Sequence, residues 1–188
     1  EALEQFLKAL PANIGMAFVI VQHLDPSHPS ILAEILQRAT AMPVLEVHDQ
    51  MPVEPDYVYV IPPNRDMVIF HRTLQLSEPA EPRHQRLPID SFFRSLALDQ
   101  GEHAAGIILS GNGSDGTFGM REILGAGGLC LVQDPATARY SGMPASVIAA
   151  GHVDQVLTVD QMPAALRGAY FGGHGPQHEV RALPQAGF

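Results

Sequence analysis

Cysteine is almost absent from this sequence, because its 188 residues include only one, Cys130. A single cysteine can form neither an internal disulfide framework nor a cysteine-based zinc cluster. Cys130 lies in the apolar run 128–132, where we expect a buried strand residue rather than a reactive thiol. Candidate chemistry therefore has to be sought in other side chains.

Basic residues are also few. Lysine and arginine total 11 against 20 aspartates and glutamates, which gives a formal charge of −9 and a pI near 5.3. The basic residues are scattered rather than gathered in a stripe, so nucleic acid is a poor candidate partner. No apolar run approaches the roughly 20 residues that span a bilayer, and the N-terminus lacks the pattern of a signal peptide. We therefore expect a cytoplasmic protein without membrane insertion.

The composition is that of an ordinary globular protein. Apolar residues make up 46% of the chain and charged residues 16%, which favours a covered interior. A chain of this length hides roughly 70% of its unfolded surface, enough for one real core. We assign the single domain to residues 1–170 and expect the aperiodic residues 171–188 to form a flexible tail or linker.

Apolar patterns of helical and strand length alternate along most of the chain. They predict helices at 1–10, 29–40, 89–99, 115–124, 144–150 and 161–169, and strands at 16–21, 106–109, 129–132 and 156–159. Strands separated by helices of this length indicate right-handed βαβ units. The fold class we predict is α/β, with a doubly wound, mainly parallel sheet flanked by helices.

The region from about 44 to 76 has a different texture. Short apolar runs are divided there by Pro, Asn and Asp, at 44–47, 57–61, 67–70 and 73–76. Such spacing predicts a small antiparallel ribbon, with the turn between two of its strands at 62–64.

Polar residues that directly follow parallel strands are the first candidates for a site, because the carboxyl ends of such strands line the ligand crevice. These places are His23, the loop 110–116 and Asp134. The loop matches the dinucleotide pattern G-x-G-x-x-G, follows a strand and opens a helix. However, Asp115 would place a carboxylate where the pyrophosphate should bind, and unit charges about 4 Å apart repel by about 4 kcal/mol at an effective dielectric near 20. A nucleotide-binding module that uses Gly111–Gly116 stays open as an alternative.

The second interpretation of Asp115 is that it orients a histidine. A carboxylate held by helix N-terminal amides stays ionised and can accept the N–H of an imidazole, which fixes the tautomer. His23 follows another strand at the same sheet edge and is the nearest candidate. Base and orienter are arranged in this way in Ser-His-Asp hydrolases on unrelated folds. Taken singly, each residue is better explained structurally, Asp115 as a plain helix cap and His23 as a packed loop histidine.

A nucleophile to accompany this pair is missing. The pattern G-x-S-x-G occurs nowhere in the chain, and no serine follows a strand in the turn that would expose its hydroxyl. A doubly wound sheet usually begins with a strand, whereas this chain opens in a helix. We therefore expect that a first strand and its glycine-rich turn lie upstream of Glu1.

Five motifs occur in register along the chain, in the segments 19–24, 59–63, 86–90, 109–116 and 141–144. Together they resemble one known family over about residues 1–170, the chemotaxis receptor methylesterases, which carry a protein-glutamate methylesterase domain. The resemblance implies that His23 and Asp115 are the catalytic histidine and aspartate. It also implies a nucleophilic serine in a G-x-S-x-G-G turn directly before the helix that opens at Glu1. That turn is absent, so we expect the chain as given to be inactive.

The resemblance carries further expectations. The intact domain would hydrolyse glutamate methyl esters, and could deamidate glutamines, on the cytoplasmic helices of methylated chemoreceptors, without a cofactor. A receiver domain or a methyltransferase domain could accompany it in the full-length protein. Asn112, which stands where many members carry methionine, and Met143 would border the substrate, and the basic pair His84 and Arg86 could steer an acidic receptor segment.

Two remaining alternatives concern other uses of the chain. A metal site could be imagined at His23 and His28, with Asp25 between them, but it lacks a third well-placed ligand, so we expect no metal. A non-catalytic descendant that only docks receptors or partner domains would fit the missing serine as well as an enzyme does.

Overall fold

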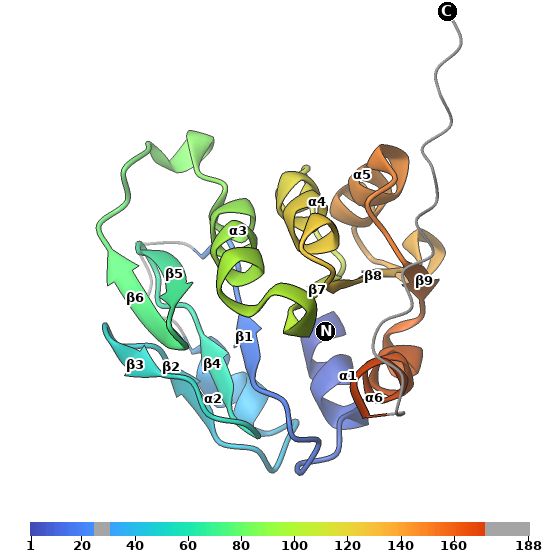
Figure 1. Ribbon diagram of the computed structural model, residues 1–188, viewed down its shortest axis with the longest axis horizontal. Coiled ribbons are helices and arrows are strands. Elements are labelled where there is room, and N and C mark those ends of the chain that lie inside the picture. The colour runs from blue at the N-terminus through green and yellow to red at the C-terminus, as the bar shows by residue number, and fades with distance from the viewer. Residues whose placement is uncertain (25–30, 172–188) are drawn as a thin grey trace, which may run out of the picture.

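The structure, a computed structural model, describes residues 1–24 and 31–171. Its strands form two parallel sheets and one small antiparallel sheet of three strands each (Figure 1). The first parallel sheet has the order β1 (Phe18–Ile20), β4 (Val58–Val60) and β2 (Val44–Glu46). The second has the order β7 (Ala105–Ile108), β8 (Leu129–Gln133) and β9 (Gln155–Leu157). The predicted α/β class with mainly parallel strands is confirmed.

Helices cover both faces of the second parallel sheet, whereas one face of the first packs against the antiparallel sheet together with α3 (Figure 1). One apolar cluster joins the sheets to α1 (Ala2–Ala9), α2 (Leu32–Gln37) and α6 (Met162–Phe171). A second cluster, on the opposite face, joins β7 and β8 to α3 (Pro88–Gln100), α4 (Thr117–Gly125) and α5 (Gly142–Ala150). Short 3-10 turns lie at Arg83–Gln85, Gly101–His103, Pro135–Thr137 and Val159–Gln161.

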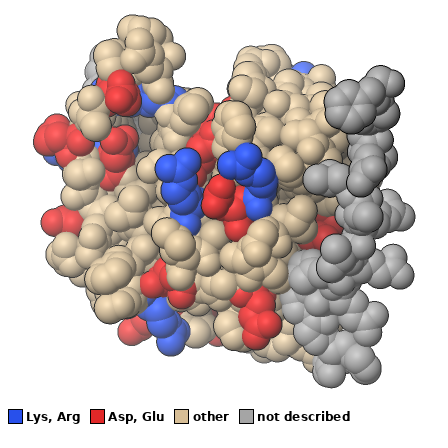
Figure 2. Space-filling view, turned by 45° about the horizontal axis from the view of Figure 1, so that its top comes forward, with Lys and Arg blue, Asp and Glu red and all other residues tan. Residues whose placement is uncertain are grey.

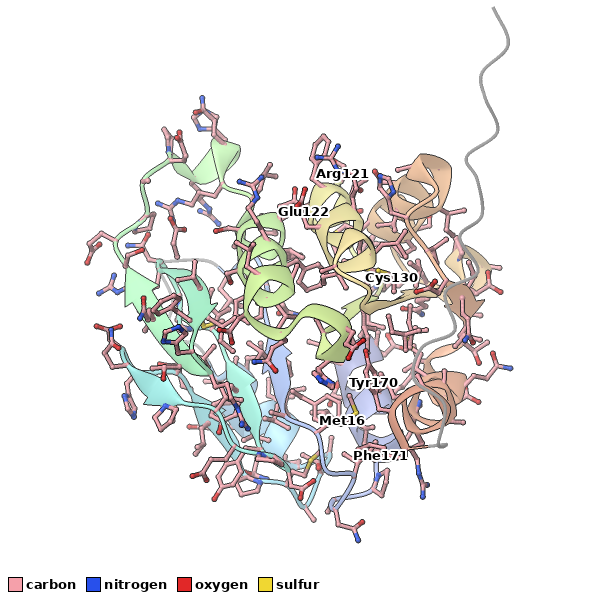
Figure 3. The ribbon with its side chains drawn as sticks, in the orientation of Figure 1. Met16, Arg121, Glu122, Cys130, Tyr170 and Phe171 are labelled. Carbon is pink, nitrogen blue, oxygen red and sulfur yellow. The ribbon has the colours of Figure 1, made fainter. Side chains whose placement is uncertain are left out.

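Strand β8 explains why its sequence is apolar without alternation. All of its residues are buried, because helices cover both of its faces. Cys130 is fully buried there, and this burial raises the pKa of its thiol, which makes it the inert strand residue that was expected (Figure 3). Tyr170 of α6 donates its hydroxyl to the Ala104 carbonyl at 2.7 Å, and burial raises its pKa to about 12.

The antiparallel ribbon is smaller than the predicted 44–76. It consists of β3 (Met51–Pro52), β6 (Thr73–Ser77) and β5 (Asp66–Phe70). The runs at 44–47 and 57–61 instead become β2 and β4, which pair in parallel with each other. The segment 62–64 therefore connects two different sheets, and the interpretation of it as a turn within the ribbon was wrong.

Several boundaries differ from those expected. The first strand is shorter than 16–21, since only Phe18–Ile20 pairs with β4. The start of the helix predicted at 29–40 lies outside the described residues, and α2 covers Leu32–Gln37. Helix α6 includes Phe171, while residues 172–188 of the expected tail lie outside the described part. Within the described ranges, no helix is both long and apolar enough to cross a membrane.

The parallel strands divide into two sheets where one was expected. β1 is an edge of the first sheet and β7 is an edge of the second. Residues of both edges line one large pocket, so the two sheets border the same space. The carboxyl ends of β1 and β7 open toward the candidate site described next.

Candidate active site

His23 and Asp115 meet at the carboxyl ends of the two sheets. His23 follows β1, and Asp115 lies in the loop between β7 and α4. The Nε2 atom of His23 is 2.8 Å from Oδ2 of Asp115. The side chain of Asp115 is 4% exposed and that of His23 is 49% exposed. The carboxylate therefore forms the buried side of the pair, while the imidazole remains accessible from the pocket.

Two backbone amides of another helix hold the Asp115 carboxylate. Oδ2 accepts a hydrogen bond from the amide of Ile89 at 3.0 Å, and Oδ1 accepts one from the amide of Asp90 at 2.9 Å. Both amides belong to the first turn of α3, where the helix dipole favours negative charge. The sequence interpretation placed Asp115 at the amides of its own helix, which was wrong, because α4 begins at Thr117.

Asp90 completes a reciprocal arrangement that the sequence did not reveal. Its Oδ1 accepts hydrogen bonds from the amides of Gly116 and Gly119, at 2.9 and 2.7 Å, in the first turn of α4. Asp115, which lies just before α4, thus caps α3, while Asp90, which lies in α3, caps α4. A side chain at Gly119 would collide with Phe93, so glycine permits this close contact. The exchange fixes where Asp115 sits relative to His23.

Removal of the Asp90 carboxylate is expected to destabilise the domain. Asp90→Ala leaves the Gly116 and Gly119 amides without their acceptor in a buried place, which costs about 1–3 kcal/mol. Asp90→Asn is the matched control, since its amide oxygen can accept both bonds, and it should lie within about 1 kcal/mol of the wild type. Urea denaturation at neutral pH measures both. Equal loss in the two variants would contradict the capping role.

The same residue predicts a pH dependence. Burial raises the pKa of the Asp90 carboxyl above its ordinary value of 3.8, and the neighbouring Asp115 carboxylate raises it further, although the Gly119 and Gly116 amides lower it. Because the folded protein then binds this proton more tightly than the unfolded chain, its free energy of unfolding falls as pH rises through the interval above 3.8. Asp90→Asn lacks this proton, so its stability relative to wild type should increase across that interval in urea titrations. A relative stability that decreases with pH would refute the shift.

Local structure explains why glycine occupies positions in the loop 110–116. Gly116 has a φ of +99°, and a Cβ there would lie 2.5 Å from the side chain of Ile108. A Cβ at Gly111 would lie 2.7 Å from Met143, whose amide donates to the Gly111 carbonyl. The amides that begin α4 are already bound to Asp90. These contacts explain the G-x-G-x-x-G pattern without a bound dinucleotide.

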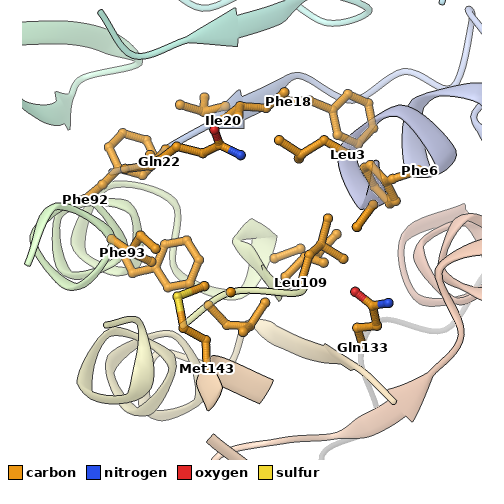
Figure 4. Close-up of a pocket in the computed structure, with 18 of the residues that line it drawn as sticks. Leu3, Phe6, Phe18, Ile20, Gln22, Phe92, Phe93, Leu109, Gln133 and Met143 are labelled. Atoms are coloured by element: carbon orange, nitrogen blue, oxygen red, sulfur yellow. The ribbon is translucent and has the colours of Figure 1, made fainter. Parts of the chain in front are cut away.

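The other predicted site residues line the same large pocket as His23 and Asp115. Asn112 is exposed, and Met143 lies over the loop at Gly111 (Figure 4). His84 is exposed, whereas Arg86 donates to the Glu81 carbonyl and to Oδ1 of Asn64. On the face shown in Figure 2, the few Lys and Arg side chains stand beside acidic ones and form no basic stripe. Arg86 is thus held by Glu81 of its own loop and by Asn64 of the segment between β4 and β5.

A second supporting residue also escaped the sequence analysis. Gln133, at the end of β8, is 3% exposed, and its Oε1 accepts the amide of Ser110 at 2.9 Å. It thereby fixes the start of the loop that carries Asp115. Asp134, which the sequence did single out, accepts the amide of Ala136 and caps a short 3-10 turn. The sequence analysis looked for a polar residue at the end of this strand and named Asp134, whereas the residue that supports the loop is its neighbour Gln133.

Metal ligation finds no support in the described ranges 1–24 and 31–171. No group of three or more His, Cys, Asp or Glu residues there could hold an ion. Asp25 and His28, the other residues of the metal alternative, lie outside the described residues.

Comparison with known proteins places these features in a family. The family described as CheB methylesterase matches residues 1–166. A Rhizobium johnstonii protein named protein-glutamate methylesterase/protein-glutamine glutaminase 2 is 36% identical over 167 residues, which are 86% of this chain and 45% of that protein. A protein of Leptospira interrogans, named putative protein-glutamate methylesterase/protein-glutamine glutaminase, is 33% identical over 86% of this chain and 84% of its own length.

A solved structure also matches this chain. The CheB methylesterase catalytic domain of Thermotoga maritima has a TM-score of 0.79 and 28% identity, with 88% of this chain and 89% of that chain covered. An uncharacterized 104.1 kDa protein of Rhodobacter capsulatus is 44% identical over 131 residues, 70% of this chain but 14% of that protein. This chain thus spans less than half of several of its relatives. With a family match over most of its length, the chain belongs to the CheB methylesterase family.

Proposed function

We propose that this domain hydrolyses glutamate methyl esters on chemoreceptors by a Ser-His-Asp mechanism, with His23 as the base and Asp115 as its orienting carboxylate. The nucleophile is a serine on a segment upstream of Glu1. The observation that carries the proposal is the 2.8 Å contact between Nε2 of His23 and Oδ2 of Asp115. The names of the relatives, which pair methylesterase with glutaminase activity, point to the same substrates.

The contact determines which imidazole nitrogen acts. Asp115 accepts at Nε2, so this nitrogen carries the proton and Nδ1 presents its lone pair. Nδ1 would remove the serine proton while Oγ attacks the ester carbonyl carbon. It would then return this proton to the methoxide, which leaves as methanol. Water would then attack the acyl-serine carbonyl. Nδ1 would remove a proton from this water and pass it to the serine Oγ, which leaves and frees the glutamate.

The burial of Asp115 suits this cycle. When Nδ1 takes up a proton, the imidazolium forms next to a carboxylate that two α3 amides keep in place. Neither side chain must move to stabilise the new charge, which is the preorganisation that acyl transfer requires. Glutamine deamidation follows the same course with ammonia as the leaving group. No step requires a cofactor.

The partners follow from this function. We propose that the substrate is the methylated cytoplasmic helix of a chemoreceptor, and that a receiver or methyltransferase domain accompanies this domain in the full-length protein. Asn112 and Met143 would border the bound ester, since both line the pocket with His23.

Methanol release from a methylated receptor fragment tests the proposal. A serine-bearing form, in which the upstream segment precedes Glu1, is expected to release methanol, and its serine-to-alanine variant is expected to release none above the uncatalysed rate. Titration calorimetry with NAD or ATP should give no heat of binding. Methanol release that survives loss of the serine, or nucleotide binding at the loop 110–116, would refute the proposed function.

A further inference from the structure

The loop between β8 and α5 is bonded to the start of the loop 110–116. We call its residues 134–141 the rim loop. The Gly111 amide donates to the Tyr140 carbonyl at 2.9 Å, and the Tyr140 amide donates to the Ser110 hydroxyl at 2.9 Å. Because these hydrogen bonds tie the rim loop to the loop that ends in the candidate catalytic aspartate, side chains next to Tyr140 stand beside the candidate active site.

Internal hydrogen bonds hold the rim loop itself. The Asp134 carboxylate accepts the amide of Ala136 at 3.0 Å, and the Asp134 carbonyl accepts the Thr137 hydroxyl at 2.8 Å. The buried Gln133 donates its side-chain amide to the Thr137 carbonyl at 3.3 Å. A side chain on this loop is therefore presented at a defined place, which lowers the entropy that binding a ligand would cost.

Arg139 is the cation that the rim loop presents. It is exposed and lines the large pocket, and its guanidinium carbon lies 5.4 Å from the centre of the Tyr140 ring. Within residues 1–24 and 31–171, no carboxylate pairs with this guanidinium. Stacking on the ring orients the planar group and leaves its N–H donors directed at solvent, where they can bind an anion.

Two other arginines show the contrast. Arg86 also lines the pocket, but its guanidinium already donates to two acceptors of this chain. Arg121 of α4 stacks on the Phe118 ring in the way that Arg139 stacks on its own tyrosine, yet it contacts Glu122 at 3.3 Å and is not among the residues that line the pocket. Arg139 therefore combines a place at the pocket with a guanidinium that has no acceptor in the described part of the chain.

The chemistry of the reaction decides what such a cation can recognise. A methyl ester carries no charge, whereas the glutamate that hydrolysis releases is an anion. An arginine directed at the reacting group would thus hold the product more tightly than the substrate. A productive contact is instead with a second carboxylate on the segment that carries the ester, which the guanidinium can bind through two parallel hydrogen bonds. The contact would also offset the repulsion between an acidic segment and a chain of net charge −9.

We propose that Arg139 is a specificity-determining residue, which selects glutamate methyl esters whose own helix carries a free carboxylate within about two turns of the ester. Arg139 binds that carboxylate away from the reacting group, so it strengthens substrate binding and leaves the chemical step unchanged. The inference rests on the proposed function for the ester, and on the hydrogen bonds between the two loops for the place of Arg139.

Paired peptides test the inference. An alanine-based helical peptide carries one glutamate methyl ester, and in each copy one alanine, one or two turns from the ester, becomes either glutamate or methionine, which is neutral and similar in length. In the serine-bearing form at low ionic strength, glutamate at one of these positions or more should lower KM for methanol release by at least about fivefold against methionine, with kcat within about twofold. Arg139→Gln should abolish this difference. Equal KM values at every position, or a preference that Arg139→Gln retains, would overturn the inference.

Charge reversal distinguishes recognition from a structural role. Arg139→Glu should prefer a peptide with lysine at the selected position to the peptide with glutamate, and Arg139→Lys, which lacks the planar fork, should keep only part of the wild-type preference. Arg121→Gln is the matched control and should keep all of it, since Arg121 is also exposed and stacked on a ring. The Tm of each variant should equal that of the wild type, because Arg139 is exposed. An Arg139→Glu protein that still prefers the glutamate peptide would overturn the inference.

Binding without hydrolysis separates this inference from the proposed function. The serine-to-alanine form is titrated with fluorescent copies of the same peptides. Anisotropy should show at least about fivefold tighter binding of the selected glutamate peptide, a preference that Arg139→Gln lacks and that salt weakens. If this preference is found while the serine-bearing form releases no methanol, the proposed function is refuted and the carboxylate-binding role of Arg139 stands. Methanol release without any preference that depends on Arg139 would refute the inference and leave the proposed function.

Discussion

Replacement of His23 with glutamine is expected to lower methanol release in the serine-bearing form by about 10³–10⁴-fold, because the serine would lose its general base. Glutamine is polar and similar in size, and the His23 side chain is 49% exposed, so the free energy of unfolding should change by less than about 0.5 kcal/mol. The activity loss would then reflect chemistry rather than folding.

A matched histidine provides the control for this prediction. His48 is exposed, contacts the carbonyl of its neighbour Asp49 and does not line the pocket, so His48→Gln should release methanol at the wild-type rate. The measurement is kcat for methanol release from a methylated receptor fragment. A His23→Gln protein that stays within tenfold of wild type would show that another group takes the serine proton.

Replacement of Asp115 has a different expected signature, since this residue supports both activity and fold. Asp115→Asn should lower kcat by about 10⁴-fold, because a neutral amide no longer selects the tautomer that leaves Nδ1 unprotonated. It should also cost about 1–3 kcal/mol of stability, since the asparagine NH₂ replaces one oxygen that accepts an α3 amide. Rates measured well below Tm, with urea denaturation in parallel, separate the two effects.

The double variant tests whether the two side chains act as one unit. If they do, His23→Gln combined with Asp115→Asn should lower kcat little further than either change alone. The first substitution already disables the pair, so the second has no remaining catalytic contribution to remove. The stability loss should instead follow Asp115 alone, since only its carboxylate binds the α3 amides. Losses in kcat that multiply would indicate two independent roles and contradict the pair.

The sequence predicted the elements better than their pairing. Runs such as Leu129–Gln133 are apolar because helices cover both faces, and this cause is visible in the sequence itself. Val44–Glu46 and Val58–Val60 looked like ribbon strands, since short runs close together in sequence usually form hairpins. In the structure β4 pairs in parallel with both β2 and β1, and no local pattern encodes these pairings.

The candidate site shows the same division. Polar residues at the ends of strands drew attention to His23 and Asp115, and the structure brings these two side chains into contact, because parallel strands bring their carboxyl ends together. The support of Asp115 could not be predicted in this way, since its amide partners on α3 lie 25 and 26 residues away in sequence. Asp90 lies in the first turn of α3, yet its acceptor oxygen binds amides of α4, and no local pattern in the sequence indicates this.

The most direct test of the central claim is an NMR measurement of the His23 imidazole at neutral pH. We predict a downfield proton on Nε2, as its 2.8 Å contact with the Asp115 carboxylate requires, and an unprotonated Nδ1, as the proposed role of base requires. Asp115→Asn should shift or remove that proton signal. A proton on Nδ1 instead, or a signal that Asp115→Asn leaves unchanged, would contradict the assignment of His23 as a base oriented by Asp115.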